Sequence, residues 1–181
     1  MLDVDADLDR ALHLEDGLKR MLDAGASLER ALALAYRYLN AQERTQAEMR
    51  AHLRGKGIDP RDVERSIQVL AEQGHLADAR FARLFVQDKR ELDQWGADRI
   101  RQVLLARGVD REVVEDAIAQ HELDWGGEIE RALALLRRRF PSPAGDRRTR
   151  ERALGMLLRK GYDTDLALEA IAIHVRDADT G

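Results

Sequence analysis

The chain has 181 residues, of which 44% are hydrophobic and only 4% aromatic, so it can bury a core built mainly from aliphatic side chains. The absence of cysteine excludes a disulfide framework, a cysteine-bound zinc ion and a thiol nucleophile. A net charge of −4 excludes a uniformly basic coat for nucleic acid but allows local clusters of arginine. No run approaches the ~20 apolar residues of a membrane span, and the acidic start does not resemble a secretory signal. We therefore expect a soluble cytoplasmic protein.

Residues 1–28 form an acidic leader. The first 29 residues hold eight acidic and three basic side chains, so this segment is more negative than the chain as a whole. We expect part of the leader, from Leu8 to Leu22, to be helical.

Three copies of one pattern follow the leader, at residues 29–76, 77–124 and 125–181. The phrases "LRGKGID", "LLARGVD" and "LLRKGYD" align at Gly57, Gly108 and Gly161. Such internal similarity is typical of tandem-repeat proteins. The composition is rich in helix-forming residues and lacks sustained β-branched alternation, so we predict an all-α fold of three-helix repeats. A three-helix unit this small is marginal alone, and we expect neighbouring units to share buried surface in an elongated, curved array.

The first copy shows the helix boundaries most clearly. Thr45 and Glu48 have the spacing of a capping box, which predicts the start of its middle helix. Gly57 predicts a left-handed stop for that helix, and Leu53 and Ile58 are the apolar pair of a Schellman turn. Asp59, followed by proline, predicts the start of the last helix.

The second and third copies repeat these signals with changes. Gly96 and Thr149 occupy the column of Thr45, so we expect Thr149 to cap the middle helix of the third copy. The stretch "PSPAGDRR" at 141–148 lengthens the link before that helix. The pair Gly126-Gly127 predicts a hinge between the second and third copies.

A longer pattern lies in the second copy. The stretch "GHLADARFARLFVQDKRELDQWGADRIRQVLLARG" at 74–108 resembles the signature of the RecX regulatory proteins. The family pattern is L-x-D-x-x-F-A-x-x-[FY]-V-x-x-[KR] followed by G-x-x-R-I-x-x-x-L-x-x-[KR]-G. The matching residues are Leu76, Asp78, Phe81, Ala82, Phe85, Val86, Lys89, Gly96, Arg99, Ile100, Leu104, Arg107 and Gly108. The stretch "ALAYRYLNAQERTQAEMRAHLRGKGI" of the first copy also fits, and the resemblance spans roughly residues 30–175.

The resemblance implies a non-enzymatic regulator of the RecA recombinase. Proteins of this family are curved chains of three-helix repeats that lie in the groove of the filament formed by RecA and single-stranded DNA. Many of them suppress strand exchange, ATP hydrolysis and co-protease activity in DNA repair, homologous recombination and the SOS response. The implied partner is this filament. Weak direct binding to DNA and a monomeric state are further expectations.

Two basic regions are the candidate partner-binding sites. The denser region comprises Arg137, Arg138, Arg139, Arg147, Arg148, Arg150 and Arg152. The other comprises Lys89, Arg90, Arg99 and Arg101 around Trp95. Arginine pairs bidentately with phosphate and carboxylate, so either region suits filament DNA or an acidic strip on the recombinase.

Each region also has a purely structural interpretation. Arg137–Arg139 also favour a helix C-terminus on a solvated face. Trp95 either stacks on a nucleic-acid base or packs into the core. The charged residues of the first copy, between Arg37 and Lys56, are expected to form ordinary helix pairs.

The sequence offers no catalytic set. The stretch "RGKG" at 54–57 lacks the rest of a phosphate-binding loop, Ser66 and Ser142 have no base at a recognisable spacing, and the five histidines are scattered. We expect no enzymatic activity, cofactor or metal. Two alternatives stay open, a direct DNA-binding module of the helix-turn-helix type and a helical scaffold for an unrelated protein partner.

Overall fold

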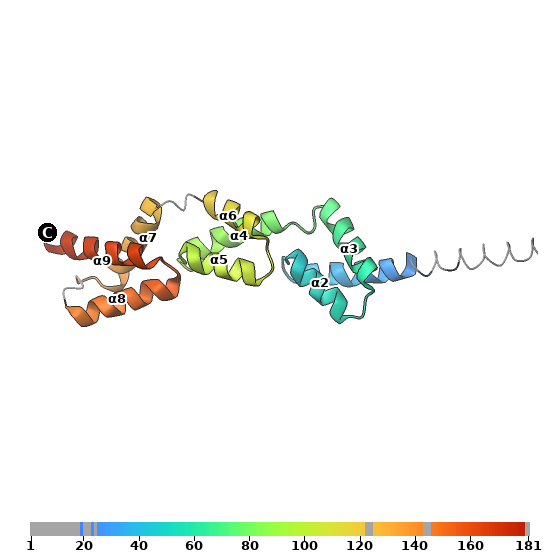
Figure 1. Ribbon diagram of the computed structural model, residues 1–181, viewed down its shortest axis with the longest axis horizontal. Coiled ribbons are helices and arrows are strands. Elements are labelled where there is room, and N and C mark those ends of the chain that lie inside the picture. The colour runs from blue at the N-terminus through green and yellow to red at the C-terminus, as the bar shows by residue number, and fades with distance from the viewer. Residues whose placement is uncertain (1–18, 20–22, 24, 122–124, 143–145, 180–181) are drawn as a thin grey trace, which may run out of the picture. The chain divides into compact units, whose positions relative to one another are not determined.

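The computed structural model describes residues 19, 23, 25–121, 125–142 and 146–179, and these residues form helices and turns without a strand. The predicted all-α class is therefore confirmed (Figure 1). Most of the leader lies outside the described residues, and of its predicted helix only Lys19 is described, as helical. Contacts within the chain divide it into two compact units, residues 1–77 and 78–181.

The first unit contains one three-helix group. Its helices are residues 25–39, α2 (Gln46–Gly55) and α3 (Pro60–Glu72). The fully buried side chains of Met49, Leu53, Val63 and Leu70 lie where these helices meet. The apolar face of α3 is thus the face that packs.

The second unit contains two three-helix groups. The first consists of α4 (Asp78–Glu91), α5 (Ala97–Ala106) and α6 (Arg111–Ala119). The second consists of α7 (Trp125–Arg139), α8 (Arg147–Lys160) and α9 (Thr164–Asp179). Each group has its own aliphatic core, with Ile100, Leu104 and Val114 buried in one and Leu136 and Leu157 in the other.

The repeated glycine turns have the predicted geometry. Gly57, Gly108 and Gly161 have φ of 72°, 79° and 85°, in the left-handed region. In the first turn, the amide of Ile58 donates to the carbonyl of Leu53 at 3.2 Å, and the amide of Gly57 donates to that of Arg54 at 3.0 Å. This is the double hydrogen bond of a Schellman motif, and equivalent bonds close the other two turns.

The helix starts agree with the sequence in most places. The Thr45–Glu48 capping box is complete, and Asp59, Asp110 and Asp163 each accept a hydrogen bond from a backbone amide two residues ahead. Each of these residues satisfies a donor that the first helical turn leaves unpaired.

Two predictions in the third copy are wrong. Helix α8 begins at Arg147 with Asp146 as its N-cap, and Thr149 is three residues inside, donating its amide to the Asp146 carboxylate at 3.0 Å. Aspartate is a stronger N-cap than threonine, and Asp146 comes before Thr149 in the chain, so the helix starts after Asp146. The Gly126-Gly127 pair is not a hinge, because both residues lie in the first turn of α7, which the buried Glu128 anchors.

A close backbone contact joins the two groups of the second unit. The Gly96 amide donates to the Lys160 carbonyl at 2.8 Å, and the Asp98 amide donates to the Gly161 carbonyl at 3.2 Å. The end of α8 therefore satisfies the first amides of α5, where no side chain does so. A Cβ atom at Gly96 would lie 2.3 Å from the Gly161 carbonyl oxygen, so this approach requires glycine.

Candidate partner-binding surfaces

An alternating row of aromatic and cationic side chains lies on the second repeat. This aromatic ladder consists of Phe81, Phe85, Lys89, Trp95, Arg99 and Arg107. The Phe81 and Phe85 ring centroids are 6.0 Å apart, and those of Phe85 and Trp95 are 6.3 Å apart, with the latter pair edge to face. Helical spacing explains the row, because Phe81, Phe85 and Lys89 follow one another at i, i+4 along one face of α4.

Cations alternate with these rings. The Arg107 guanidinium is 4.4 Å from the Phe81 centroid, and the Arg99 guanidinium is 4.0 Å from the Trp95 centroid. Between them, the Lys89 ammonium is 5.1 Å from Trp95. These distances are typical of cation–π contacts, which hold the charged groups over the rings.

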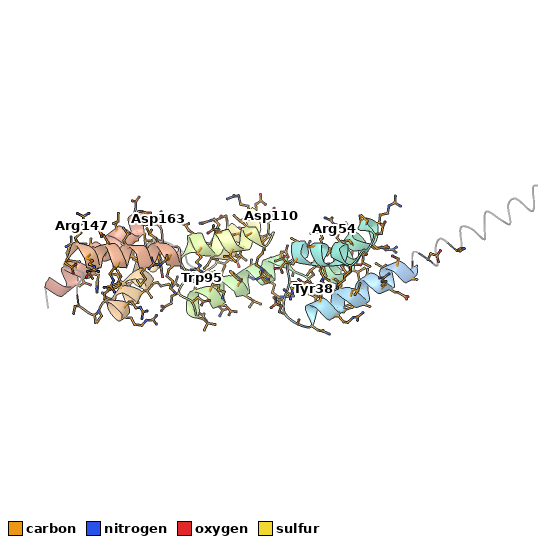
Figure 2. The ribbon with its side chains drawn as sticks, turned by 90° about the horizontal axis from the view of Figure 1, so that it is seen from below. Tyr38, Arg54, Trp95, Asp110, Arg147 and Asp163 are labelled. Atoms are coloured by element: carbon orange, nitrogen blue, oxygen red, sulfur yellow. The ribbon has the colours of Figure 1, made fainter. Side chains whose placement is uncertain are left out.

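The structural interpretation of Trp95 applies in part, because its ring packs against the core, while base stacking stays a prediction. Its ring is half-buried and packs against the core of the second group while forming part of the ladder (Figure 2). Lys89 also pairs with Asp93 at 2.6 Å, and this hydrogen bond lowers the pKa of the Asp93 carboxyl. Arg99 donates to the carbonyl of Arg159 at 2.8 Å, which links the ladder to the third repeat.

The other two predicted residues of this region have structural partners. Arg90 is buried, and its guanidinium pairs with the buried Glu128 of α7. Burial lowers the pKa of Arg90, and the Glu128 charge opposes that effect. Arg101 pairs with Glu115 at 2.7 Å and with Asp98 at 2.6 Å. Arg90 therefore offers no surface to a partner, and Arg101 spans two helices of its own repeat.

A second cationic surface is hollowed into the third repeat. This arginine cleft has a volume of about 670 Å³, and Arg139, Arg148, Arg152 and Arg159 line it together with Glu151, Phe140, Gly155 and Met156. The Arg152 guanidinium lies 6.0 Å from the Phe140 ring. Four arginines facing one carboxylate favour an anionic ligand.

The remaining predicted arginines lie around the same repeat. Arg137 pairs with Asp177 at 2.9 Å, and Arg138 donates to the Gln94 amide oxygen at 2.8 Å. The exposed side chain of Arg147 pairs with Glu151 at 2.8 Å. Arg150 is exposed on α8. The structure thus brings Arg139 and Arg148 together in the cleft, while Arg137 and Arg138 point to partners within the chain.

Sequence reasoning missed several residues of these surfaces. The sequence predicts Arg152 as part of the denser basic region and Arg107 only as a match to the family pattern, and nothing in it indicates Arg159 as a binding residue. The i, i+4 spacing of Phe81, Phe85 and Lys89 is a signal that could have identified the ladder. In the cleft, Arg148, Arg152 and Arg159 follow one another at i, i+4 and i+11 on one face of α8, which is a signal of the same kind, and only Arg139 comes from another helix.

The first repeat pairs its charges within the repeat, but the ion pairs join α2 to α3 rather than neighbours along one helix. Arg50 and Arg54 both contact Glu64, at 2.9 and 3.4 Å. The Arg44 guanidinium lies 4.2 Å from the ring of Tyr38, which stacks on His52. This repeat therefore presents neither an aromatic ladder nor an arginine cleft among the contacts of its described residues.

Chemically, the two surfaces suit stacking and anion pairing. Aromatic rings interleaved with cations are the arrangement that binds single-stranded nucleic acid, and arginine clusters bind phosphate or carboxylate. Among the described residues, no group of three or more His, Asp or Glu side chains is placed to hold a metal ion. Within the same residues, no helix is both long and apolar enough to cross a membrane.

Comparisons with protein families match all three repeats. Profiles described as the first, second and third three-helix domains of RecX match residues 31–70, 78–118 and 127–171. The protein named "Regulatory protein RecX" of Halorhodospira halophila is 36% identical over 163 residues, which cover 89% of this chain and 98% of that protein. Its namesake in Mycobacterium avium is 36% identical over 147 residues, covering 79% and 83% of the two chains.

Solved structures support the same fold. The crystal structure of RecX from Lactobacillus salivarius superposes with a TM-score of 0.71 at 22% identity, covering 87% of this chain and 99% of that one. A second structure, titled "Crystal structure of regulatory protein RecX", gives a TM-score of 0.67 at 23% identity. At this level of identity the structures establish the fold, and the sequence relatives establish the family. The chain belongs to the RecX family of regulatory proteins.

Proposed function

We propose that this chain binds the filament of RecA and single-stranded DNA in its groove and restrains strand exchange, ATP hydrolysis and co-protease activity. Membership of a family of regulatory proteins, across all three repeats, is the observation that carries the proposal. The chain would act by occupancy, as a cytoplasmic monomer in DNA repair and the SOS response, without catalysing a reaction itself.

The two cationic surfaces support this proposal. In the aromatic ladder, Phe81 is buried in the core, so the ladder provides its cations for phosphates and the half-buried rings of Phe85 and Trp95 for bases. The arginine cleft provides anion-binding groups on the neighbouring repeat. Contacts from several repeats to more than one filament subunit combine through effective concentration, so each contact can be weak. A protein held across subunits obstructs the incoming duplex and resists the rearrangement that accompanies ATP turnover.

Filament assays test the proposal directly. Saturating protein should lower the rates of ATP hydrolysis and strand exchange by a preformed RecA filament. Charge reversal of three cleft arginines, R139E/R148E/R152E, should weaken filament binding by about tenfold or more, because attraction to phosphate or carboxylate becomes repulsion. Full activity of the filament at saturating protein would contradict the inhibitory role.

A matched control separates the cleft from net charge. The variant R61E/R65E/R111E changes the net charge equally at exposed arginines of α3 and α6 that lie outside both surfaces. It should bind the filament nearly as the unaltered chain does. Equal losses in the two triple variants would mean that general electrostatics, rather than the cleft, drives binding.

Binding to naked DNA distinguishes the proposed filament regulator from the alternative, a direct DNA-binding module. The ladder favours some affinity for single strands, so affinities for naked single- and double-stranded DNA should be measured beside the filament at two salt concentrations. We expect the filament to bind more tightly than either DNA. Tight and steeply salt-dependent binding to naked DNA would instead support a direct DNA-binding module.

A further inference from the structure

The third repeat differs from the other two at one pair of aligned positions. In the first repeat, Arg50 of α2 pairs with Glu64 of α3 at 2.9 Å. In the second, Arg101 and Glu115 occupy the same columns and pair at 2.7 Å. In the third, the equivalent residues are Leu154 of α8 and Leu168 of α9. An ion pair that joins the middle and last helices has thus been replaced by two leucines.

These leucines contribute to an apolar groove. The groove lies between α8 and α9 and has a volume of about 920 Å³. Its aliphatic lining consists of Leu154, Leu168, Ile171, Ala172 and Val175. Leu168 keeps 49% of its surface exposed. Covering this apolar surface with a ligand would remove it from water, which is favourable in free energy. The lining covers about two helical turns, or ~12 Å of α9.

The rim of the groove is predominantly cationic. Arg147, Arg150 and Arg176 border the aliphatic floor, and Glu151 is the single acidic residue among the lining residues. Arg147, labelled in Figure 2, is the first residue of α8. A ligand that fits must therefore combine an apolar face with flanking negative charge.

We propose that this groove binds an acidic amphipathic helix of a protein partner. Such a helix places aliphatic side chains at i, i+3, i+4 and i+7 on the floor and its carboxylates against the rim arginines. Nucleic acid fits this floor less well, because its phosphates need the cations but do not fill an aliphatic groove. The first two repeats lack the site, since a charged pair occupies the position of the two leucines.

Peptide binding to the full chain tests the assignment. The probes are a helical peptide of about 18 residues with a leucine face flanked by glutamates, the same peptide with lysines in place of the glutamates, and a thymidine single strand. Binding is followed through methyl NMR signals of the chain. We expect the acidic peptide to bind and to shift the signals of Leu154, Leu168, Ile171 and Val175, and the lysine peptide to bind at least about tenfold more weakly.

The sequence itself suggests the decisive variant. L154R/L168E restores the ion pair that the other repeats carry, so it should fold while removing the apolar floor. It should weaken binding of the acidic peptide by about tenfold or more. The control L84R/L92E makes the same exchange at exposed leucines outside the groove and should bind as the unaltered chain does.

Several outcomes would overturn the assignment. These are equal binding of the acidic and lysine peptides, unchanged binding by L154R/L168E, or tighter binding of the thymidine strand at the same methyl groups. A concentration-dependent dimer in sedimentation that L154R/L168E abolishes would assign the groove to a second copy instead. The peptide assay contains no recombinase, so its failure is distinguishable from failure of the proposed function.

Discussion

At the scale of single residues, equivalent glycines have unequal surroundings. Gly57 and Gly161 share the left-handed conformation, with φ of 72° and 85°. A Cβ atom at Gly57 would meet nothing within 4 Å, whereas one at Gly161 would lie 2.3 Å from the Arg99 Cβ and 2.5 Å from the Arg99 amide nitrogen. The repeat pattern predicts the left-handed turn at both positions, but it does not predict that Arg99 crowds Gly161.

We expect Gly161→Ala to destabilise the chain more than Gly57→Ala. Both substitutions carry the cost of a left-handed alanine, about 1 kcal/mol. Gly161→Ala adds a collision with backbone, which should raise the loss in the free energy of unfolding by a further ~1–3 kcal/mol. Urea denaturation of both variants measures the difference. Equal losses would mean that α5 and α8 do not approach as closely as described.

His52 provides a pH-dependent contribution to stability. Burial, together with Lys56 and Arg44, lowers the pKa of His52 below its ordinary value of 6.5. The unfolded chain therefore binds the proton at higher pH than the folded chain does. The contribution of neutral His52 is present above pH 6.5 and is lost as the pH falls through the lower, folded-state pKa.

His52→Phe should reduce this dependence. Phenylalanine can keep the stacking on Tyr38, whose ring centroid is 3.9 Å from that of His52, but it does not titrate. The free energy of unfolding, measured between about pH 5 and 7, should fall less steeply with acid in the variant. An unchanged slope would show that other groups dominate this pH range.

At the scale of helices, the sequence predicted those helix ends that are determined by residues close together in the chain. The Thr45–Glu48 box, Asp59 and Gly57 act within a few residues of their partners, so their spacing alone predicted the helix ends. The repeat alignment predicts Thr149 as a cap, but Asp146 is the stronger local cap and starts α8. Gly96 cannot cap a helix with a side chain as Thr45 does, and nothing local indicates that the end of α8 supplies the hydrogen-bond partners instead.

The buried ion pair between α4 and α7 allows a quantitative test. Arg90→Met alone leaves the Glu128 charge buried without its partner, which should cost about 3–5 kcal/mol of unfolding free energy. R90M/E128M removes both charges and should recover much of that loss. A double-mutant cycle by urea denaturation gives the coupling. If the single losses simply add in the double variant, the two side chains do not interact in the folded chain.

At the scale of the whole molecule, the second and third repeats form one unit of the chain. A fragment of residues 78–181 should therefore keep its helicity and unfold cooperatively. A fragment of residues 78–121 should be largely unfolded, because Gly96 and Arg90 lose their partners and a unit of this size is marginal. Circular dichroism during heating compares them, and equal melting temperatures would contradict a shared structure.

The family and the all-helical fold were predictable from sequence, but the binding surfaces were predictable only in part. Ladder residues Lys89 and Arg99 and cleft residues Arg139 and Arg148 were identified as cations in clusters. The sequence does not distinguish these cations from Arg90, which is buried against Glu128, because that burial depends on how α4 packs on α7. Pairing between helices that are distant in the chain leaves no periodic mark, so a cluster of arginines in sequence overstates the binding surface.

The contact between Gly96 and Gly161 limits how the repeats can be shuffled. They look like modules that a protein engineer could duplicate or reorder. Transplanting the first repeat into the second position, however, would put Thr45 in the place of Gly96, and its Cβ would collide with the Gly161 carbonyl, which lies 2.3 Å from a Cβ at that site. Chimaeras built from this chain must therefore carry these two glycines together, as one unit.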